Sequence, residues 1–222
     1  MAKVAHSKAD SVYAELKEAI LSGALEPGSL IDKAGLCERF GVSRFPVSAA
    51  VSKLAYDRLV DVAPQHGSFV TRISVNDVRE RLFIRAALEC EIAAEAARRM
   101  DREGKKALLA NLKEAAAAAQ DSDKARFYRI DVAFHQTLAG KLAMARASEI
   151  LDGLRVHLER VRRLLMWPAG RLEGTLREHA SIAEAIEAAD PDAARTAMKR
   201  HLGATTAHLE IIARERPEMF SP

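Results

Sequence analysis

The sequence has little of what disulfide-rich, secreted or membrane-spanning proteins need. Its two cysteines, Cys37 and Cys90, are isolated and form no C-x-x-C motif, as is usual in a reducing compartment. No apolar run approaches the roughly 20 residues that a transmembrane helix requires. The first ten residues, MAKVAHSKAD, lack the apolar core of a secretory signal. We therefore expect a cytoplasmic protein that does not associate with a membrane.

Aromatic residues and excess charge are scarce as well. Aromatics make up 5% of the chain, while hydrophobic residues reach 49% with much alanine, a composition that favours helix over sheet. The net charge is only +3, and residues 1–72 hold nine Lys/Arg against eight Asp/Glu. Charge alone therefore does not indicate a nucleic-acid partner. At 222 residues the chain can form one or two domains, each with a core of its own.

An amphipathic helix is expected near the N-terminus. Val12, Leu16 and Ile20 recur at helical spacing, so they share one face. Asp10 or Ser11 is the expected N-cap, because a short polar side chain accepts hydrogen bonds from the first free N–H groups. The stretch SGALEPGS ends this helix, since its glycines and proline favour a turn.

Two further helices and a hairpin follow at short intervals. The segment DKAGLCERFG, residues 32–41, predicts a short helix ended by Gly41 in a left-handed conformation. A third helix begins after Ser43, and two β-rich runs then flank the turn at residues 64–67. This order, helix, short helix, helix and hairpin, is that of a winged helix-turn-helix.

From Ser74 onward the pattern predicts only helices. They are expected at residues 75–100, 103–120, 124–142, 143–165, 172–189 and 191–214. Short connections favour antiparallel neighbours, so we expect an all-helical antiparallel bundle. The chain is thus predicted to be mainly α, with a winged helix-turn-helix domain at 1–73 and a helical domain at 74–222.

The third helix carries the candidate DNA contacts. The second helix of a helix-turn-helix enters the major groove with its N-terminal residues at base edges. Here those residues include Ser43, Arg44 and Ser48, and Arg44 can pair with guanine in bidentate fashion. Gly67, at the hairpin turn, would let the main chain approach a groove closely. A small helical subdomain with a solvated Arg44 is the alternative.

Residues 10–72 resemble the N-terminal domain of GntR-family bacterial transcription regulators. The resemblance is carried by LEPGSL, by GVSRFPV at residues 41–47, by LV at 59–60 and by GSFV at 67–70. It implies double-stranded DNA as partner, with Arg44 and Gly67 as contacts and Ser43 and Ser48 beside them. Three positions depart from the family pattern: Ser48 and Ala34 replace arginines, and Arg58 replaces a glycine. The missing arginines are expected to weaken or redirect base contacts.

Four polar residues occupy otherwise apolar helix faces in the second domain. Asp131 and His135 share a face with phenylalanines, and His179 and His201 each lie on a face of apolar residues. A single histidine of this kind is ordinarily a core residue with a hydrogen-bond partner. One carboxylate and three imidazoles on three helices also suit a divalent transition metal, with zinc or nickel expected.

Residues 75–215 resemble the FCD effector domain of the FadR subfamily. DVAFH, REH and KRHL carry the resemblance, which implies that Asp131, His135, His179 and His201 bind a divalent metal below an effector cavity. RAALE matches a further family motif and places Arg85 on an inward face. A buried guanidinium suits a carboxylate, so Arg85 is the expected effector contact. The alternative is an ion pair, for example with Glu89.

Together these features predict a ligand-responsive transcription regulator. A homodimer would bind a two-fold-symmetric operator, and a small organic acid in the helical domain would alter its DNA affinity. Two alternatives remain open. The metal itself could be the signal, or the His₃Asp site could activate water in a metal-dependent enzyme acting on a carboxylate. We do not expect an enzyme, because no general base, nucleophile constellation or phosphate-binding glycine loop accompanies the site.

Overall fold

The computed structural model describes residues 7–165 and 170–221. They fall into two compact units. The N-terminal unit comprises the chain up to Val75 together with Glu159–Leu164 and the segment from Ile212 onward. The helical unit comprises Asn76–Leu158 and Leu165–Ile211. The chain therefore passes between the units more than once.

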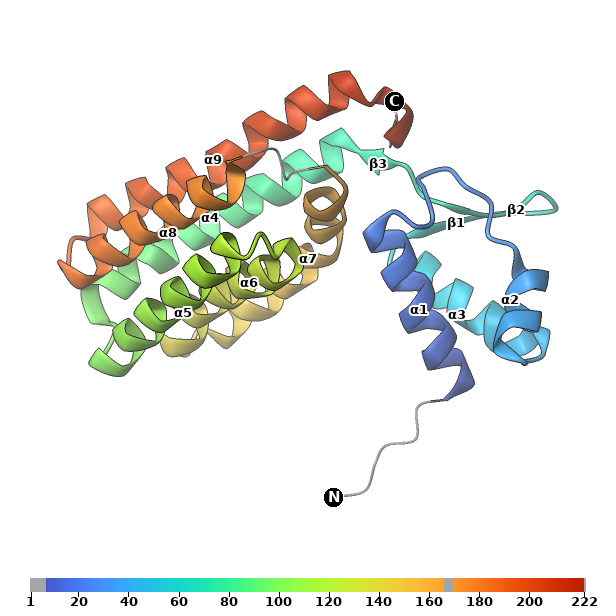
Figure 1. Cartoon of the computed structure of the whole chain (residues 1–222), viewed down its shortest axis with the longest axis horizontal. Coiled ribbons are helices and arrows are strands. Elements are labelled where there is room, and N and C mark those ends of the chain that lie inside the picture. The colour runs from blue at the N-terminus through green and yellow to red at the C-terminus, as the bar shows by residue number, and fades with distance from the viewer. Residues whose placement is uncertain (1–6, 166–169, 222) are drawn as a thin grey trace. The chain divides into compact units, whose positions relative to one another are not determined.

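The N-terminal unit contains three helices and a hairpin, drawn in blue to teal in Figure 1. These elements are α1 (Lys8–Ser22), α2 (Lys33–Phe40), α3 (Arg44–Tyr56), β1 (Val60–Ala63) and β2 (Gly67–Val70). Helix α3 packs against both α1 and α2, and β1 pairs with β2 in antiparallel register, Val60 opposite Val70. Apolar residues of α1 and α3 fill the core between them. The predicted winged helix-turn-helix is confirmed.

Of the predicted helix caps in this unit, one was wrong and one is confirmed. The expected N-cap of α1, Asp10 or Ser11, was wrong, because Ser7 caps the helix and accepts a hydrogen bond from the backbone N–H of Asp10. Asp10 instead lies in the first turn, where a carboxylate interacts favourably with the helix dipole. Gly41 ends α2 with φ 60°, in the left-handed conformation that was predicted.

The N-terminal unit also contains segments from far along the chain. A two-residue strand β3 (Ile73–Ser74) pairs in parallel with β4 (Phe220–Ser221), which follows the short 3₁₀ helix η1 (Pro217–Met219). Arg160 is buried and donates hydrogen bonds to the hydroxyl and the carbonyl of Thr71, at 3.0 and 2.5 Å. Its burial lowers the pKa of Arg160 to about 10, so the guanidinium stays charged at neutral pH. Such two-residue pairings leave no periodic signal in a sequence.

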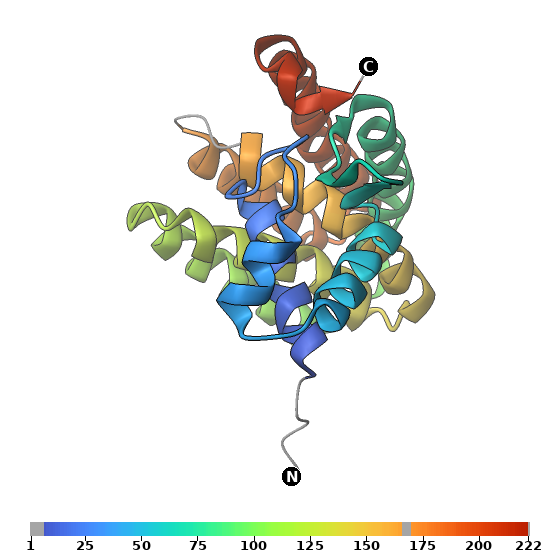
Figure 2. The same ribbon diagram turned by 90° about the vertical axis from the view of Figure 1, so that its right-hand side faces the viewer.

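The helical unit consists of long helices that run alongside one another, as Figures 1 and 2 show. They are α4 (Val75–Arg99), α5 (Arg102–Gln120), α6 (Lys124–Lys141), α7 (Ala145–Leu165), α8 (Arg171–Glu187) and α9 (Pro191–Glu215), although Glu159–Leu164 of α7 and the end of α9 from Ile212 onward belong to the N-terminal unit. All bounds lie within two residues of those expected, so the all-helical prediction is confirmed. Among the described residues, no helix is long and apolar enough to cross a membrane.

The core of the helical unit joins α4, α6, α8 and α9. Small side chains such as Ala93 and Ala97 of α4 let neighbouring helices approach closely. Phe134 and Leu138 of α6 pack into the same cluster as Ile182 of α8. Phe134, Leu138 and Ile182 each lie about one helical turn from a polar residue of α6 or α8. Their packing therefore fixes the backbone that carries those polar residues.

Candidate metal centre and nucleic-acid interface

The structure brings Asp131, His135, His179 and His201 together. Their candidate ligand atoms all lie within 4.8 Å of one another. Asp131 and His135 are one helical turn apart on α6, while α8 and α9 supply one histidine each. All four side chains are buried, with His201 fully so and His135 the most exposed at 7%. Four polar groups thus converge at one point inside the helical unit.

The histidines face one another through their Nε2 atoms. The Nε2 atoms of His179 and His201 lie 3.3 Å apart, as do those of His201 and His135. An oxygen of Asp131 lies 3.5 Å from Nε2 of His179. A tetrahedral metal with bonds of about 2.0–2.1 Å places its ligand atoms about 3.3 Å apart. The donor set and these three spacings therefore fit a transition metal.

Packing against Phe134 fixes the ring orientation of His179. The ring of Phe134 stacks on that of His179, with centroids 4.1 Å apart and planes inclined by 7°. Phe134 is itself fully buried in the apolar core. Because the phenyl ring lies flat against the imidazole, rotation of His179 about its side-chain bonds would require the core to move.

Two carboxylates contact the histidines from the side opposite the shared centre. Oε2 of Glu89 lies 2.5 Å from Nδ1 of His135, and Oε2 of Glu178 lies 2.7 Å from Nδ1 of His201. Burial alone would raise the pKa of Glu89, but Arg85 and His135 lower it far below its usual range. The pKa of Glu178 is also lowered despite its burial, through hydrogen bonds with His201 and Arg171. Both carboxylates are therefore anions at neutral pH.

Arg85 is buried, as its position on the apolar face of α4 predicted. Only 8% of the residue is exposed, and its Nε donates to Oε1 of Glu89 at 2.5 Å. The ion pair considered as the alternative therefore exists. Among the described residues, only Glu89 accepts a hydrogen bond from the Arg85 side chain, and it does so through Nε. The two terminal nitrogens of Arg85 therefore retain their hydrogen-bonding capacity.

The candidate DNA contacts lie on the exposed side of α3 and at the hairpin. Ser43 occupies the N-cap position of α3 without a side-chain capping bond, and Arg44 and Ser48 are exposed. Gly67 begins β2 with φ 122°, and a Cβ atom there would lie 2.7 Å from Cδ1 of Leu30. The hairpin thus requires glycine at this position for its own conformation and packing.

The three departures from the GntR pattern are all exposed. Ala34 lies in the first turn of α2 and Ser48 on α3, so no packing requirement explains either residue. Arg58 has φ 57°, a left-handed conformation that glycine adopts more readily. The backbone that the family glycine would form is therefore kept, with an exposed cation added.

Sequence reasoning missed two kinds of residue. Phe45 is 82% exposed in the first turn of α3, next to Arg44, and its position on the face opposite Val47 could have identified it. Glu178 contacts His201 but lies 23 positions away in the sequence. Only the arrangement of α8 against α9 reveals that contact.

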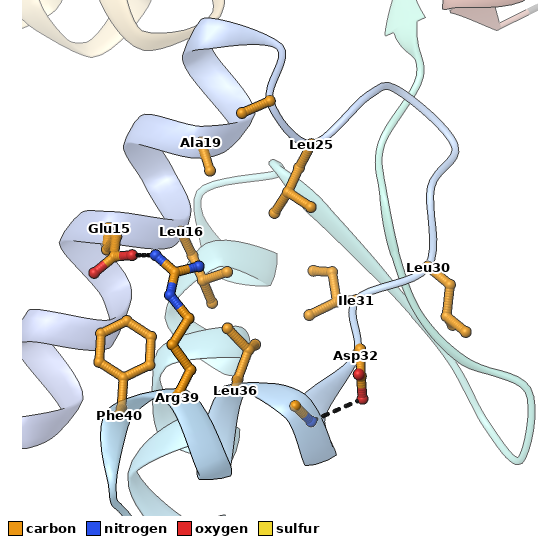
Figure 3. Close-up of a pocket in the computed structure, with 12 residues that line it drawn as sticks. Glu15, Leu16, Ala19, Leu25, Leu30, Ile31, Asp32, Leu36, Arg39 and Phe40 are labelled. Atoms are coloured by element: carbon orange, nitrogen blue, oxygen red, sulfur yellow. Dashed lines mark hydrogen bonds and ion pairs between the residues drawn. The ribbon is translucent and has the colours of Figure 1, made fainter.

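The N-terminal unit also has a groove of about 300 Å³, shown in Figure 3. It is lined mainly by apolar residues of α1, α2 and the segment between them. Arg39 of α2 forms an ion pair with Glu15 of α1 beside it, and Asp32 caps α2 by accepting from the N–H of Gly35. None of the candidate DNA contacts lines this groove.

Comparison with known proteins identifies both parts of the chain. Residues 8–70 match the family described as bacterial regulatory proteins, gntR family, and residues 80–204 match the FCD domain. The HTH-type transcriptional repressor RspR of Escherichia coli K12 is 32% identical over 210 residues, which cover 95% of this chain and 92% of RspR. An HTH-type transcriptional regulator of Streptomyces ambofaciens is 31% identical, over 95% of this chain and 88% of its own length.

Solved structures show the same fold. A GntR transcriptional regulator of Rhodococcus sp. RHA1 is 25% identical with a TM-score of 0.74, covering 92% of this chain and 98% of its own. Escherichia coli McbR/YncC is 22% identical with a TM-score of 0.73, covering 93% and 99%. The matching gntR family and the relative RspR are transcription regulators, so the enzyme interpretation of the His₃Asp cluster is set aside. The chain belongs to the GntR family of bacterial transcription regulators, with a DNA-binding helix-turn-helix followed by a FadR-like FCD domain.

Proposed function

We propose that this regulator binds its operator through the first turns of α3 and the hairpin. Arg44 would read guanine, with Ser43 and Ser48 at neighbouring bases or phosphates and Gly67 at the adjacent groove. Phe45 would add an apolar contact to a thymine methyl group. The exposure of Ser43, Arg44, Phe45 and Ser48 at one end of α3 supports the proposal.

The effector is proposed to be a small organic acid bound at a metal in the helical unit. The single observation that carries this proposal is the convergence of Asp131, His135, His179 and His201 at ligand spacing. Zinc or nickel suits three imidazoles and a carboxylate. When bound, the metal would offer a Lewis-acidic position to one oxygen of the acid. Arg85 would receive another carboxylate oxygen through its terminal N–H groups.

The regulator is proposed to act as a homodimer on a two-fold-symmetric site. Two copies related by a dyad place two α3 helices on two half-sites, which explains why such operators are palindromic. If the acid changes the affinity for DNA, DNA must change the affinity for the acid by the same factor. This reciprocity makes the proposal testable from either side.

The first experiment is selection of binding sites from random duplex DNA with purified protein at a stated salt concentration. A two-fold-symmetric sequence should be enriched, and binding to it should be lost in Arg44→Ala. The enriched site then serves as a probe in titrations with carboxylic acids, in the presence of Zn²⁺ or Ni²⁺ and after chelation. An operator affinity that no acid changes at any metal occupancy would refute the effector proposal.

A second candidate function is a metal-responsive regulator, in which the ion is the signal. The burial of the ligands favours it, because Asp131, His179 and His201 are each at most 1% exposed and leave an organic ligand little direct access. This candidate requires DNA affinity to follow metal occupancy without any acid. The same titration separates the two functions.

A further inference from the structure

We propose that Glu89 and Glu178 are positioning residues of the metal centre, each the middle member of an arginine–glutamate–histidine chain that presents Nε2 of one histidine to the ion. This inference rests on the proposed metal site and goes beyond its four ligands. It assigns roles to residues of α4 and α8 that supply no ligand atom. Two such chains approach the centre from different helices.

The first chain runs from α4 to α6 and is buried throughout. Nε of Arg85 donates to Oε1 of Glu89 at 2.5 Å, and Oε2 of Glu89 lies 2.5 Å from Nδ1 of His135. The glutamate side chain is 5% exposed and that of the arginine 10%. Neither Oε2 of Glu89 nor Nδ1 of His135 makes a hydrogen bond of normal geometry to any described residue. The close polar contact of each atom is the other, at 2.5 Å.

The second chain runs from α8 to α9 and repeats the same order of groups. Arg171 donates to both oxygens of Glu178, at 2.9 and 3.2 Å. Oε2 of Glu178 lies 2.7 Å from Nδ1 of His201, and Nε2 of that ring points to the shared centre. This chain is less enclosed, because the glutamate side chain is 18% exposed and that of the arginine 17%.

The chemistry of imidazole explains why the carboxylates matter. A neutral histidine carries one proton, and only its unprotonated nitrogen can bind a metal. An anionic carboxylate at Nδ1 holds the proton there and leaves the lone pair on Nε2. It also fixes the ring orientation and makes the ligand more basic. The arginine keeps the carboxylate ionised and holds it in place, Arg85 through Oε1 of Glu89 and Arg171 through both oxygens of Glu178.

Without a cation, the same arrangement is unfavourable. If both Nδ1 atoms carry the protons, the Nε2 lone pairs of His135 and His201 face each other at 3.3 Å with no hydrogen between them. A metal ion held by His135 and His201 would remove this repulsion, because both lone pairs would then face a cation. The two glutamates therefore organise the site for metal before the ion arrives.

The test measures Zn²⁺ affinity by competition with a chelator of known affinity, using full-length protein. Glu89→Gln and Glu178→Gln should each weaken binding by about 10- to 100-fold, the usual effect of losing such a carboxylate. Glu80→Gln on α4 and Glu184→Gln on α8 are matched controls, because both residues are exposed on the same helices and neither forms an ion pair with a described residue. The controls should remain close to wild type.

A second measurement separates positioning from a purely structural role. Long-range ¹H–¹⁵N spectra of the metal-free protein report which ring nitrogen of each histidine is protonated. His201 should carry its proton on Nδ1 in wild type and lose that preference in Glu178→Met, which removes the acceptor. His135 should keep its own tautomer in the same variant. Glu178 is partly exposed, so these variants keep the test usable if Glu89→Gln does not fold.

The outcomes distinguish this inference from the metal site itself. If wild type binds Zn²⁺ and Glu178→Gln binds it as tightly as Glu184→Gln, the positioning role is wrong and the metal site stands. If wild type binds neither Zn²⁺ nor Ni²⁺, the proposed metal site fails. In that case a proton on Nε2 of both His135 and His201 in the metal-free protein would overturn the positioning role as well.

Discussion

Metal binding should raise the thermal stability of the helical unit by a calculable amount. The four ligands come from α6, α8 and α9, so the ion binds the folded unit and has no equivalent site in the unfolded chain. A ligand present at a hundredfold excess over its Kd adds about 2.7 kcal/mol. For a unit of about 130 residues, each kcal/mol raises Tm by about 4 °C, which gives an increase of about 10 °C.

The assay is calorimetry of the chelator-treated protein with and without Zn²⁺ at a hundredfold excess over the measured Kd. Asp131→Asn is the informative variant, because it keeps the shape of the side chain and removes the only carboxylate among the four ligands. Its Zn²⁺-dependent increase in Tm should be smaller than that of wild type at the same metal concentration. Glu184→Gln should behave like wild type, since that residue lies on the exposed face of α8.

Two results would refute this reasoning. One is a wild-type Tm that metal does not raise although binding is measured directly, because the ion would then bind somewhere that unfolding does not destroy. The other is an equal increase in wild type and Asp131→Asn, which would place the ion away from the cluster.

Four further predictions address the rest of the molecule. Arg44→Ala should weaken binding to the selected operator by about 1–3 kcal/mol and relax the preference for guanine at one position, measured by gel shift against single-base variants; equal losses on all sequences would indicate a phosphate contact instead. Replacing the operator thymines with uracil one at a time removes each methyl group in turn. At one position this replacement should weaken DNA binding by wild type but not by Phe45→Ala. If no thymine behaves in this way, Phe45 does not contact a methyl group. Arg58→Gly should stabilise the protein by about 0.5–1 kcal/mol in urea unfolding, because glycine relieves the left-handed backbone at φ 57°; a loss of stability would mean that the arginine side chain is needed. The pKa of Glu178 is lowered in the folded state, so its contribution to the free energy of unfolding is complete above the unfolded pKa of about 4.3 and is lost as pH falls below that value. Metal-free Glu178→Gln should therefore lose less stability on acidification than wild type. Identical acid-unfolding profiles would contradict the lowered pKa.

Helical periodicity predicted most of the fold because it records which faces are buried. The six helices after Ser74 were placed to within two residues, since Gly, Asp and Pro interrupt an otherwise continuous apolar pattern. Asp131, His135, His179 and His201 were recognisable for the same reason, as polar residues on faces that the pattern requires to be buried.

Features that depend on contacts between distant segments could not be predicted. The pairing of β3 with β4 joins residues 73–74 to 220–221, and neither pair has a strand-like pattern of its own. Glu178 resembles any solvated glutamate on α8 until the neighbouring α9 brings His201 within 2.7 Å. The capping of α1 by Ser7 was missed because Asp10 and Ser11 are equally good capping residues by type, and only the backbone distinguishes them.

Helix α9 is continuous and contributes residues to both units of the chain, and this continuity has a mechanical consequence. It carries His201 of the candidate metal centre in the helical unit, and its residues from Ile212 onward are part of the N-terminal unit. Ten residues of continuous helix lie between these two positions, which are about 16 Å apart along the axis. A helix resists compression along its axis because every turn is joined by hydrogen bonds. A shift of His201 along that axis would therefore move Ile212 with it, without any chain of side-chain rearrangements between them.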